Sequence, residues 1–173
     1  MSHQVHEPLV VVDYDPEWPR EFERLAARVA DVGVAVEHVG STAVPGLAAK
    51  PIVDLYVLVH DRSDMAAAVA RLEALGYRHL GDLGITGREA FDWPAGEQRH
   101  HLYLAAVDDP GFLRSCAFRD RLRAQPELVT AYAQLKRELA ERHRDDRDAY
   151  SEGKSAFIDA CTGDALVSNT NKS

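Results

Sequence analysis

The segment HVGSTAVPGLAAKPIVD, residues 38–54, lies between two stretches that are typical of β-strands. The stretch that leads into it, residues 34–39, alternates and is rich in β-branched side chains. The stretch that follows, residues 52–59, is the most apolar run of the chain. The segment is therefore expected to connect two consecutive strands, and the second strand is expected to be deeply buried.

The turn that begins at Gly40 is a candidate phosphate-binding loop. Gly40 lets the backbone approach a ligand without a Cβ in the way. Ser41 and Thr42 offer hydroxyl groups, and the amides of the following turn can point at a phosphate. The spacing is neither that of a Walker A loop nor that of a Gly-x-Gly-x-x-Gly fingerprint. The alternative is a tight turn with a hydroxyl cap at the end of a strand.

Asp54 is the one charged residue within the apolar run 52–59. The two-residue period of a strand places Asp54 and Tyr56 on one face of the sheet. Because an unpartnered buried carboxylate costs several kcal/mol, Asp54 needs a cation, hydrogen-bond donors or a metal ion beside it. A site for metal or phosphate chemistry is one interpretation, and a structural pair with Lys50 or an arginine is the other.

A later strand, expected at residues 99–106, carries His101 and Tyr103 on one face. If the leucines of this strand face the core, His101 and Tyr103 face the same cleft as Asp54. A histidine beside an aspartate suits proton transfer near neutral pH, or a softer metal such as Zn²⁺ or Mn²⁺. The alternative is a solvated histidine at the start of a strand.

The remaining periodicity predicts an α+β fold with a mixed or antiparallel sheet, since strands gather early and helices late. Further strands are expected at 77–81 and 88–93. Helices are expected at about 16–31, with Asp15 as its cap and Pro16 in its first turn, and between a Ser63 cap and Gly76. The expected organisation is one domain over residues 1–162, followed by a flexible tail over 163–173.

The C-terminal third is expected to be helical from Pro110 onward. Tyr132 and leucines at helical spacing form an apolar stripe on the segment 127–144, and charged residues, including Lys136, are assigned to the opposite, outer face. Tyr150 and Lys154 are four residues apart, so they are expected to share one face of the last helix.

Composition excludes several classes of protein. Twenty Lys and Arg against 28 Asp and Glu give a net charge of −8, which argues against a protein that binds duplex nucleic acid through bulk positive charge. No apolar run approaches the roughly 18–20 residues that span a bilayer, and the first residues do not form a secretory signal. Cys116 and Cys161 are far apart and are expected to be reduced thiols on helices of a cytoplasmic protein.

The segment 38–54 resembles the signature of the GrpB family, which is placed in the polymerase-β-like nucleotidyltransferase superfamily. The resemblance continues in order through Tyr14-Asp15-Pro16-Glu17-Trp18-Pro19, His100-His101-Leu102, Phe118-Arg119-Asp120-Arg121-Leu122-Arg123 and Tyr150-x-x-Gly153-Lys154-x-x-Phe157. It implies a small mixed sheet with helices on one side and a C-terminal helical segment. It also implies a Gly-Ser turn at a nucleotide phosphate and strand acids that bind Mg²⁺.

From this resemblance the chain is expected to transfer a nucleotidyl group from ATP, or another nucleoside triphosphate, to a small-molecule or protein acceptor. Asp54 and His101 are the expected catalytic and metal-binding residues, with Mg²⁺ as the metal and Mn²⁺ or Zn²⁺ as alternatives. The expected nucleotide-binding residues are Gly40, Ser41, Thr42, Lys50, Tyr150 and Lys154.

The sequence departs from the superfamily pattern at one informative position. Superfamily enzymes carry Asp-x-Asp or Asp-x-Glu where this chain has Asp54-Leu55-Tyr56. A tyrosine phenol stays protonated near neutral pH and is a poor Mg²⁺ ligand. Two further hypotheses therefore stay open: a regulatory module that binds a nucleotide or another anion without turnover, and a cleft that has been adapted to act on a small metabolite.

Overall fold

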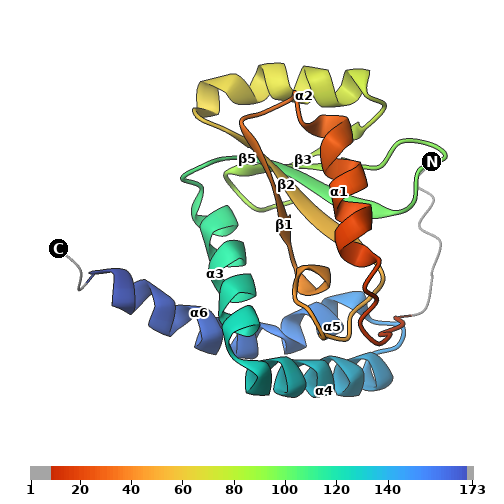
Figure 1. Cartoon of the computed structure of the whole chain (residues 1–173), viewed down its shortest axis with the longest axis vertical. Coiled ribbons are helices and arrows are strands. Elements are labelled where there is room, and N and C mark those ends of the chain that lie inside the picture. Colours follow the sequence, from red (N-terminus) through yellow and green to blue (C-terminus); the bar gives the residue numbers. More distant parts are fainter. Residues whose placement is uncertain (1–8, 171–173) are drawn as a thin grey trace.

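A five-stranded mixed sheet is the centre of the fold in the computed structural model, which describes residues 9–170 (Figure 1). The strands are β1 (Ala35–Val39), β2 (Val53–Val59), β3 (Arg78–Gly81), β4 (Arg88–Asp92) and β5 (His100–Ala106), in the order β1-β2-β5-β4-β3. Strands β2 and β5 are parallel, and the other neighbours are antiparallel. The predicted α+β class and all five predicted strands are confirmed.

The helices follow the expected order along the chain. They are α1 (Trp18–Val29), α2 (Met65–Ala74), α3 (Pro110–Ala124), α4 (Pro126–Arg142), α5 (Arg147–Gly153) and α6 (Ser155–Thr170), together with the short 3₁₀ helices η1 (Ser41–Ala43) and η2 (Arg62–Asp64). No helix in the described part of the chain is long and apolar enough to cross a membrane.

One face of the sheet forms the main core with α1 and α2. Its members from β2 are Val53, Leu55, Val57 and Val59, and they pack with Leu25 of α1 and Leu72 of α2, all buried. These residues alternate with Asp54 and Tyr56 along the strand, so the predicted division of β2 into two faces is correct.

The other face of the sheet is covered by α3. Tyr56 and Leu58 of β2 and Ala105 of β5 form a second buried cluster with Phe112 of α3. The expectation that the helices lie on one side of the sheet is therefore wrong. The physical reason is that α3 follows β5 directly: buried Asp109 caps it by accepting a hydrogen bond from the Phe112 amide at 3.0 Å.

The starts of two helices differ from the expectation in their capping residues. Helix α1 begins at Trp18, and the Asp15 carboxylate accepts a hydrogen bond from the Glu17 amide at 2.9 Å in the turn before it. In the second case Asp61 caps η2 by accepting from the Ser63 amide at 2.8 Å, so Ser63 is a donor there. An aspartate at the preceding strand end competes well for this role because its carboxylate reaches the amide two residues ahead.

The helical segment around Tyr150 is divided in two. Helix α5 ends at Gly153 and α6 begins at Ser155, so Tyr150 and Lys154 do not share one helix face as expected. A Cβ on Gly153 would lie 2.5 Å from Leu139 Cδ2, so this glycine lets α4 and α5 pack closely. Helix α6 continues to Thr170, past the expected end of the domain at 162, and the domain boundary stays a prediction.

Candidate functional site

Gly40 sets the shape of the candidate site because its backbone conformation is one that other residues avoid. Its φ is 74° and its ψ is −174°, a region that is essentially restricted to glycine. A Cβ at this position would lie 2.3 Å from Asp54 Oδ2. The Asp54 carboxylate therefore lies directly against the backbone at the start of the turn, where the sequence predicted the approach of a ligand.

Asp54 and His101 are neighbours across the parallel β2–β5 pair. Asp54 Oδ1 lies 2.6 Å from His101 Nδ1, and the side chains are 26% and 40% exposed. The carboxylate thus has its partner on the adjacent strand rather than in Lys50 or an arginine. A carboxylate that orients an imidazole in this way is the arrangement of a general base, in which the carboxylate holds one ring nitrogen and leaves the other to act.

Lys136 is a site residue that the sequence analysis missed. It is only 2% exposed, and its Nζ donates a hydrogen bond to Ser41 Oγ at 2.9 Å. The assignment of Lys136 to an outer face of its helix is therefore wrong. One signal was present: Lys136 lies four residues after Tyr132 and three before Leu139, both members of the apolar stripe.

Burial changes the acidity of Lys136. The cost of desolvation, together with the charges of Lys154, Arg137 and Lys50, lowers the pKa of Lys136 to about 7. An amine with such a pKa is present in both its charged and its neutral form near neutral pH. It can therefore accept a proton as well as donate one.

Thr42, one of the expected phosphate-binding residues, faces the protein interior. It is 2% exposed, and its Oγ1 lies 2.9 Å from His38 Nε2. The His38 ring stacks on Phe22 with 4.6 Å between ring centres, and burial lowers the pKa of His38 to about 4. The Thr42 hydroxyl therefore already has a partner, and we assign it to stabilising the turn.

Two of the expected cations meet on one aromatic ring. The Nζ atoms of Lys50 and Lys154 lie 4.3 Å and 4.4 Å from the centre of the Tyr150 ring, which is buried. Burial and the charge of Lys154 lower the pKa of Lys50 to about 8, and burial lowers the pKa of Lys154. Lysines that disfavour one another's charge in this way are stabilised when an anion binds between them.

Two arginines of α3 bind the backbone before η1 and at its last residue. Arg119 donates from one NH group to the His38 carbonyl oxygen and to Glu37, each at 2.8 Å. Arg123 Nε donates to the Ala43 carbonyl oxygen at 2.8 Å. Residues 118–123 belong to the sequence resemblance, but their contacts with the turn are visible only in the tertiary structure.

The residues around Asp54 do not fit a metal centre that the protein alone would hold. Tyr56, at the position of the second superfamily acid, is buried against Tyr103 and Phe112. Burial raises the pKa of the Tyr56 phenol. Within residues 9–170 there is no group of three or more His, Cys, Asp or Glu side chains placed to hold a metal ion. Asp54 and His101 are partners of each other instead.

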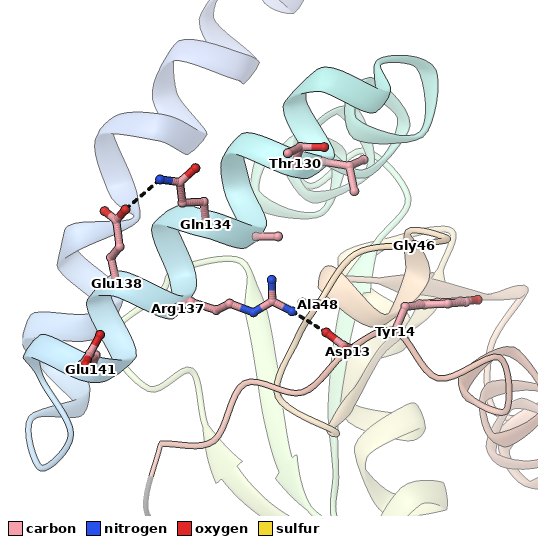
Figure 2. Close-up of a pocket in the computed structure, with 11 residues that line it drawn as sticks. Asp13, Tyr14, Gly46, Ala48, Thr130, Gln134, Arg137, Glu138 and Glu141 are labelled. Carbon is pink, nitrogen blue, oxygen red and sulfur yellow. Dashed lines mark hydrogen bonds and ion pairs between the residues drawn. The ribbon is translucent and has the colours of Figure 1, made fainter.

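A pocket in the described part of the chain is lined by other residues (Figure 2). It has a volume of about 740 Å³ and lies between the segment around Asp13, the loop at Gly46–Ala48 and α4, where an Arg137–Asp13 ion pair crosses it. None of the expected site residues lines it. We place the candidate site at the turn, because the Asp54–His101 pair and the Lys136–Ser41 contact lie there.

Comparison with known proteins agrees with the sequence signature. The GrpB protein family matches residues 8–164. The chain is 39% identical to a UPF0157 protein of Pseudomonas aeruginosa over 165 residues, which cover 91% of this chain and 67% of that protein. It is 34% identical to UPF0157 protein YqkA of Bacillus subtilis, and the match covers 86% of this chain but only 44% of YqkA.

Two solved structures place the fold. The crystal structure of conserved protein GrpB from Enterococcus faecalis superimposes with a TM-score of 0.80 and 35% identity, covering 94% of this chain and all of that one. A structure of the Cid1 poly(U) polymerase with Mg 3'-dATP bound superimposes with a TM-score of 0.54 and 14% identity, covering 83% of this chain and 49% of that one. At this identity the second likeness shows the fold, which is nucleotidyltransferase-like.

Proposed function

The chain belongs to the GrpB family, and we propose that it is a nucleotidyltransferase-like enzyme that moves a nucleotidyl group from a nucleoside triphosphate to a small-molecule or protein acceptor. The observation that carries this proposal is the convergence at one turn of an aspartate–histidine pair, a serine and three lysines. Such a site offers positive charge for a triphosphate and a base for the attacking group.

The lysines on Tyr150 provide for the anionic part of the substrate. Lys50 and Lys154 are half-buried, and each ammonium group makes a cation–π contact with the Tyr150 ring. In the proposal they neutralise the β- and γ-phosphates beside the turn at Gly40, whose lack of a Cβ leaves room for the Asp54 carboxylate. The net charge of −8 supports a small nucleotide rather than a duplex nucleic acid as the partner, and we place the enzyme in the cytoplasm.

The aspartate–histidine pair provides for the acceptor. His101 takes the proton of the acceptor hydroxyl or amine, and Asp54 holds the imidazole in orientation through the 2.6 Å contact. The acceptor atom bonds to the α-phosphorus, the bond from this phosphorus to the bridging oxygen breaks, and pyrophosphate leaves toward Lys50 and Lys154. In the proposal Mg²⁺ enters as part of the substrate, on the triphosphate.

A second function is favoured by one observation. Tyr56 replaces the second acid and is buried under α3, so the site lacks the carboxylate pair on which nucleotidyltransferases of this fold depend. A module that binds a nucleotide and regulates a partner without turnover needs the lysines and the turn but neither Asp54 nor His101.

Replacement of Asp54 by Asn tests for turnover. We expect release of pyrophosphate from γ-³²P-labelled nucleoside triphosphates, offered with a mixture of metabolites, to fall by at least about a hundredfold, because the imidazole loses its orienting charge. ATP binding by calorimetry should be retained, and the matched change Asp31→Asn at an exposed turn should have no effect. Unchanged turnover in D54N contradicts the proposal, and tight ATP binding without any product in the wild type favours the regulatory module.

Replacement of Lys50 or Lys154 by Met tests the phosphate site. We expect each change to weaken ATP binding by about tenfold, which is ~1.4 kcal/mol. Wild-type affinity should also fall as the pH rises through the pKa of Lys50, about 8, since the lysine then loses its charge. Calorimetry at pH 7 and pH 9 measures both effects, with exposed Arg20→Met as the control. If both lysine variants bind ATP as tightly as the wild type does, the triphosphate binds elsewhere.

A further inference from the structure

We propose that Ser41 is a covalent acceptor in this reaction: its Oγ takes the nucleotidyl group from the triphosphate, with Lys136 as the proton acceptor, before the group passes to the final acceptor. The inference rests on the proposed function and adds an intermediate to it. It comes from the 2.9 Å contact between Lys136 Nζ and Ser41 Oγ, which is the geometry of a serine nucleophile beside its base.

Lys136 is held in place by its surroundings. It is on α4, is 2% exposed, and its Nζ lies 4.7 Å from the centre of the buried Tyr132 ring. Ser41 lies at the start of η1, where Arg123 binds the Ala43 carbonyl oxygen. Both partners are therefore fixed before a substrate arrives, and a fixed nucleophile–base contact is the requirement for activating a hydroxyl.

The three lysines divide into two roles. Lys50 and Lys154 lie on the Tyr150 ring, and in the proposal they bind the anionic triphosphate. Lys136 instead forms a hydrogen bond with the Ser41 hydroxyl group. The low pKa of Lys136 supports the second role, because a neutral amine is needed to accept the Ser41 proton. A serine hydroxyl without such a partner is a weak nucleophile at neutral pH.

The site also contains one more proton acceptor than a direct transfer needs. The Asp54 carboxylate contacts Gly40, with His101 as its partner, and Ser41 is the next residue, with Lys136 as its partner. A double displacement activates two nucleophiles in turn, and a separate base can serve each of them. The Asp54–His101 pair beside Gly40 and the Lys136–Ser41 pair therefore fit a double displacement.

Both steps balance. In the first step Ser41 Oγ bonds to the α-phosphorus, the bond to the bridging oxygen breaks, pyrophosphate leaves, and the hydroxyl proton passes to Lys136 Nζ. In the second step the acceptor bonds to the same phosphorus and gives its proton to His101. The bond from phosphorus to Ser41 Oγ then breaks, and Lys136 returns its proton to that oxygen.

The experiment is to incubate the full chain with α-³²P-labelled ATP and Mg²⁺ without an acceptor, and to locate the label by mass spectrometry. We expect an adenylyl group on Ser41 and one pyrophosphate released per labelled chain. In Ser41→Ala the label should be absent, and in Lys136→Met it should fall by at least about a hundredfold. The change Arg142→Met, at an exposed position in the last turn of the same helix, should leave it unchanged.

A second arm needs no nucleotide. A fluorophosphonate probe reacts with activated serines, so it should label Ser41 in the wild type and fail in Lys136→Met. If Ser41→Ala still transfers the nucleotidyl group to an acceptor at the wild-type rate, the covalent step is overturned and the proposed function stands. If Ser41 reacts with neither ATP nor the probe, the covalent step is likewise overturned, and the Asp54→Asn experiment decides the proposed function independently.

Discussion

Replacement of Gly40 by Ala should destabilise the protein by about 3 kcal/mol and abolish catalysis, because the added Cβ has no space and the backbone has an unsuitable conformation. The φ of 74° and ψ of −174° alone cost a non-glycine residue about 1–3 kcal/mol. The Cβ would also lie 2.3 Å from Asp54 Oδ2, so the carboxylate must move away and its contact with His101 must change.

The same loop offers a matched control in Gly46. Its φ of 81° is also positive, but a Cβ there would meet no atom within 4 Å. Gly46→Ala should therefore show only the backbone penalty, about 1 kcal/mol, and retain the site. Urea unfolding of both variants measures the difference. If Gly40→Ala is no less stable than Gly46→Ala, the close approach of Asp54 to the turn is not a feature of the folded protein.

Replacement of Lys136 by Met should stabilise the protein by about 2–3 kcal/mol at pH 6, although it removes a hydrogen bond. The pKa of this lysine falls from 10.5 to about 7 on folding, and each pKa unit corresponds to about 1.4 kcal/mol. Methionine fills a similar volume without a charge that must be buried. Loss of the Ser41 contact keeps the expected gain below the full value of the shift.

The stability of the wild-type protein should depend on pH because folding lowers the pKa of Lys136. Between pH 7 and pH 10.5 the unfolded chain holds a proton on Lys136 that the folded chain has released, so wild-type stability should rise with pH in this window. Lys50, with a pKa of about 8, contributes in the same direction. In Lys136→Met the rise should be smaller, and the advantage over the wild type should shrink as the pH rises from 6 to 9.

Urea unfolding at pH 6 and pH 9 measures both quantities. Arg142→Met is the control, since Arg142 is exposed in the last turn of α4, so its effect should be within about 0.5 kcal/mol. If Lys136→Met is less stable than the wild type at pH 6, interactions in the folded protein offset the desolvation cost of the Lys136 ammonium, and the prediction is wrong. A stable Lys136→Met variant also shows that a loss of Ser41 labelling has a chemical cause.

The part of the site formed by the strands could be predicted from the sequence. Alternation along β2 placed Asp54 and Tyr56 on the face away from the main core, and alternation along β5 placed His101 and Tyr103 on the corresponding face. This prediction works because the period of a strand is a local property that does not depend on what packs against it. The parallel pairing of these strands then brings Asp54 and His101 together.

The helical part of the site could not be predicted in the same way. A period of 3.6 residues identifies a stripe on α4, but not which neighbour that stripe meets, and so Lys136 was assigned to solvent although it contacts Ser41. Lys154 contacts Tyr150 across the break between α5 and α6, where no helical spacing applies.

The sequence by itself determined the family, the order of strands and helices along the chain, and the glycine turn that ends β1. Only the tertiary structure decided which side chains the turn binds: Thr42 faces His38 in the interior, while Ser41 receives Lys136 from 95 residues away. The reason is that local patterns specify an element and its faces, whereas the position of α4 against the end of the sheet depends on packing between distant segments.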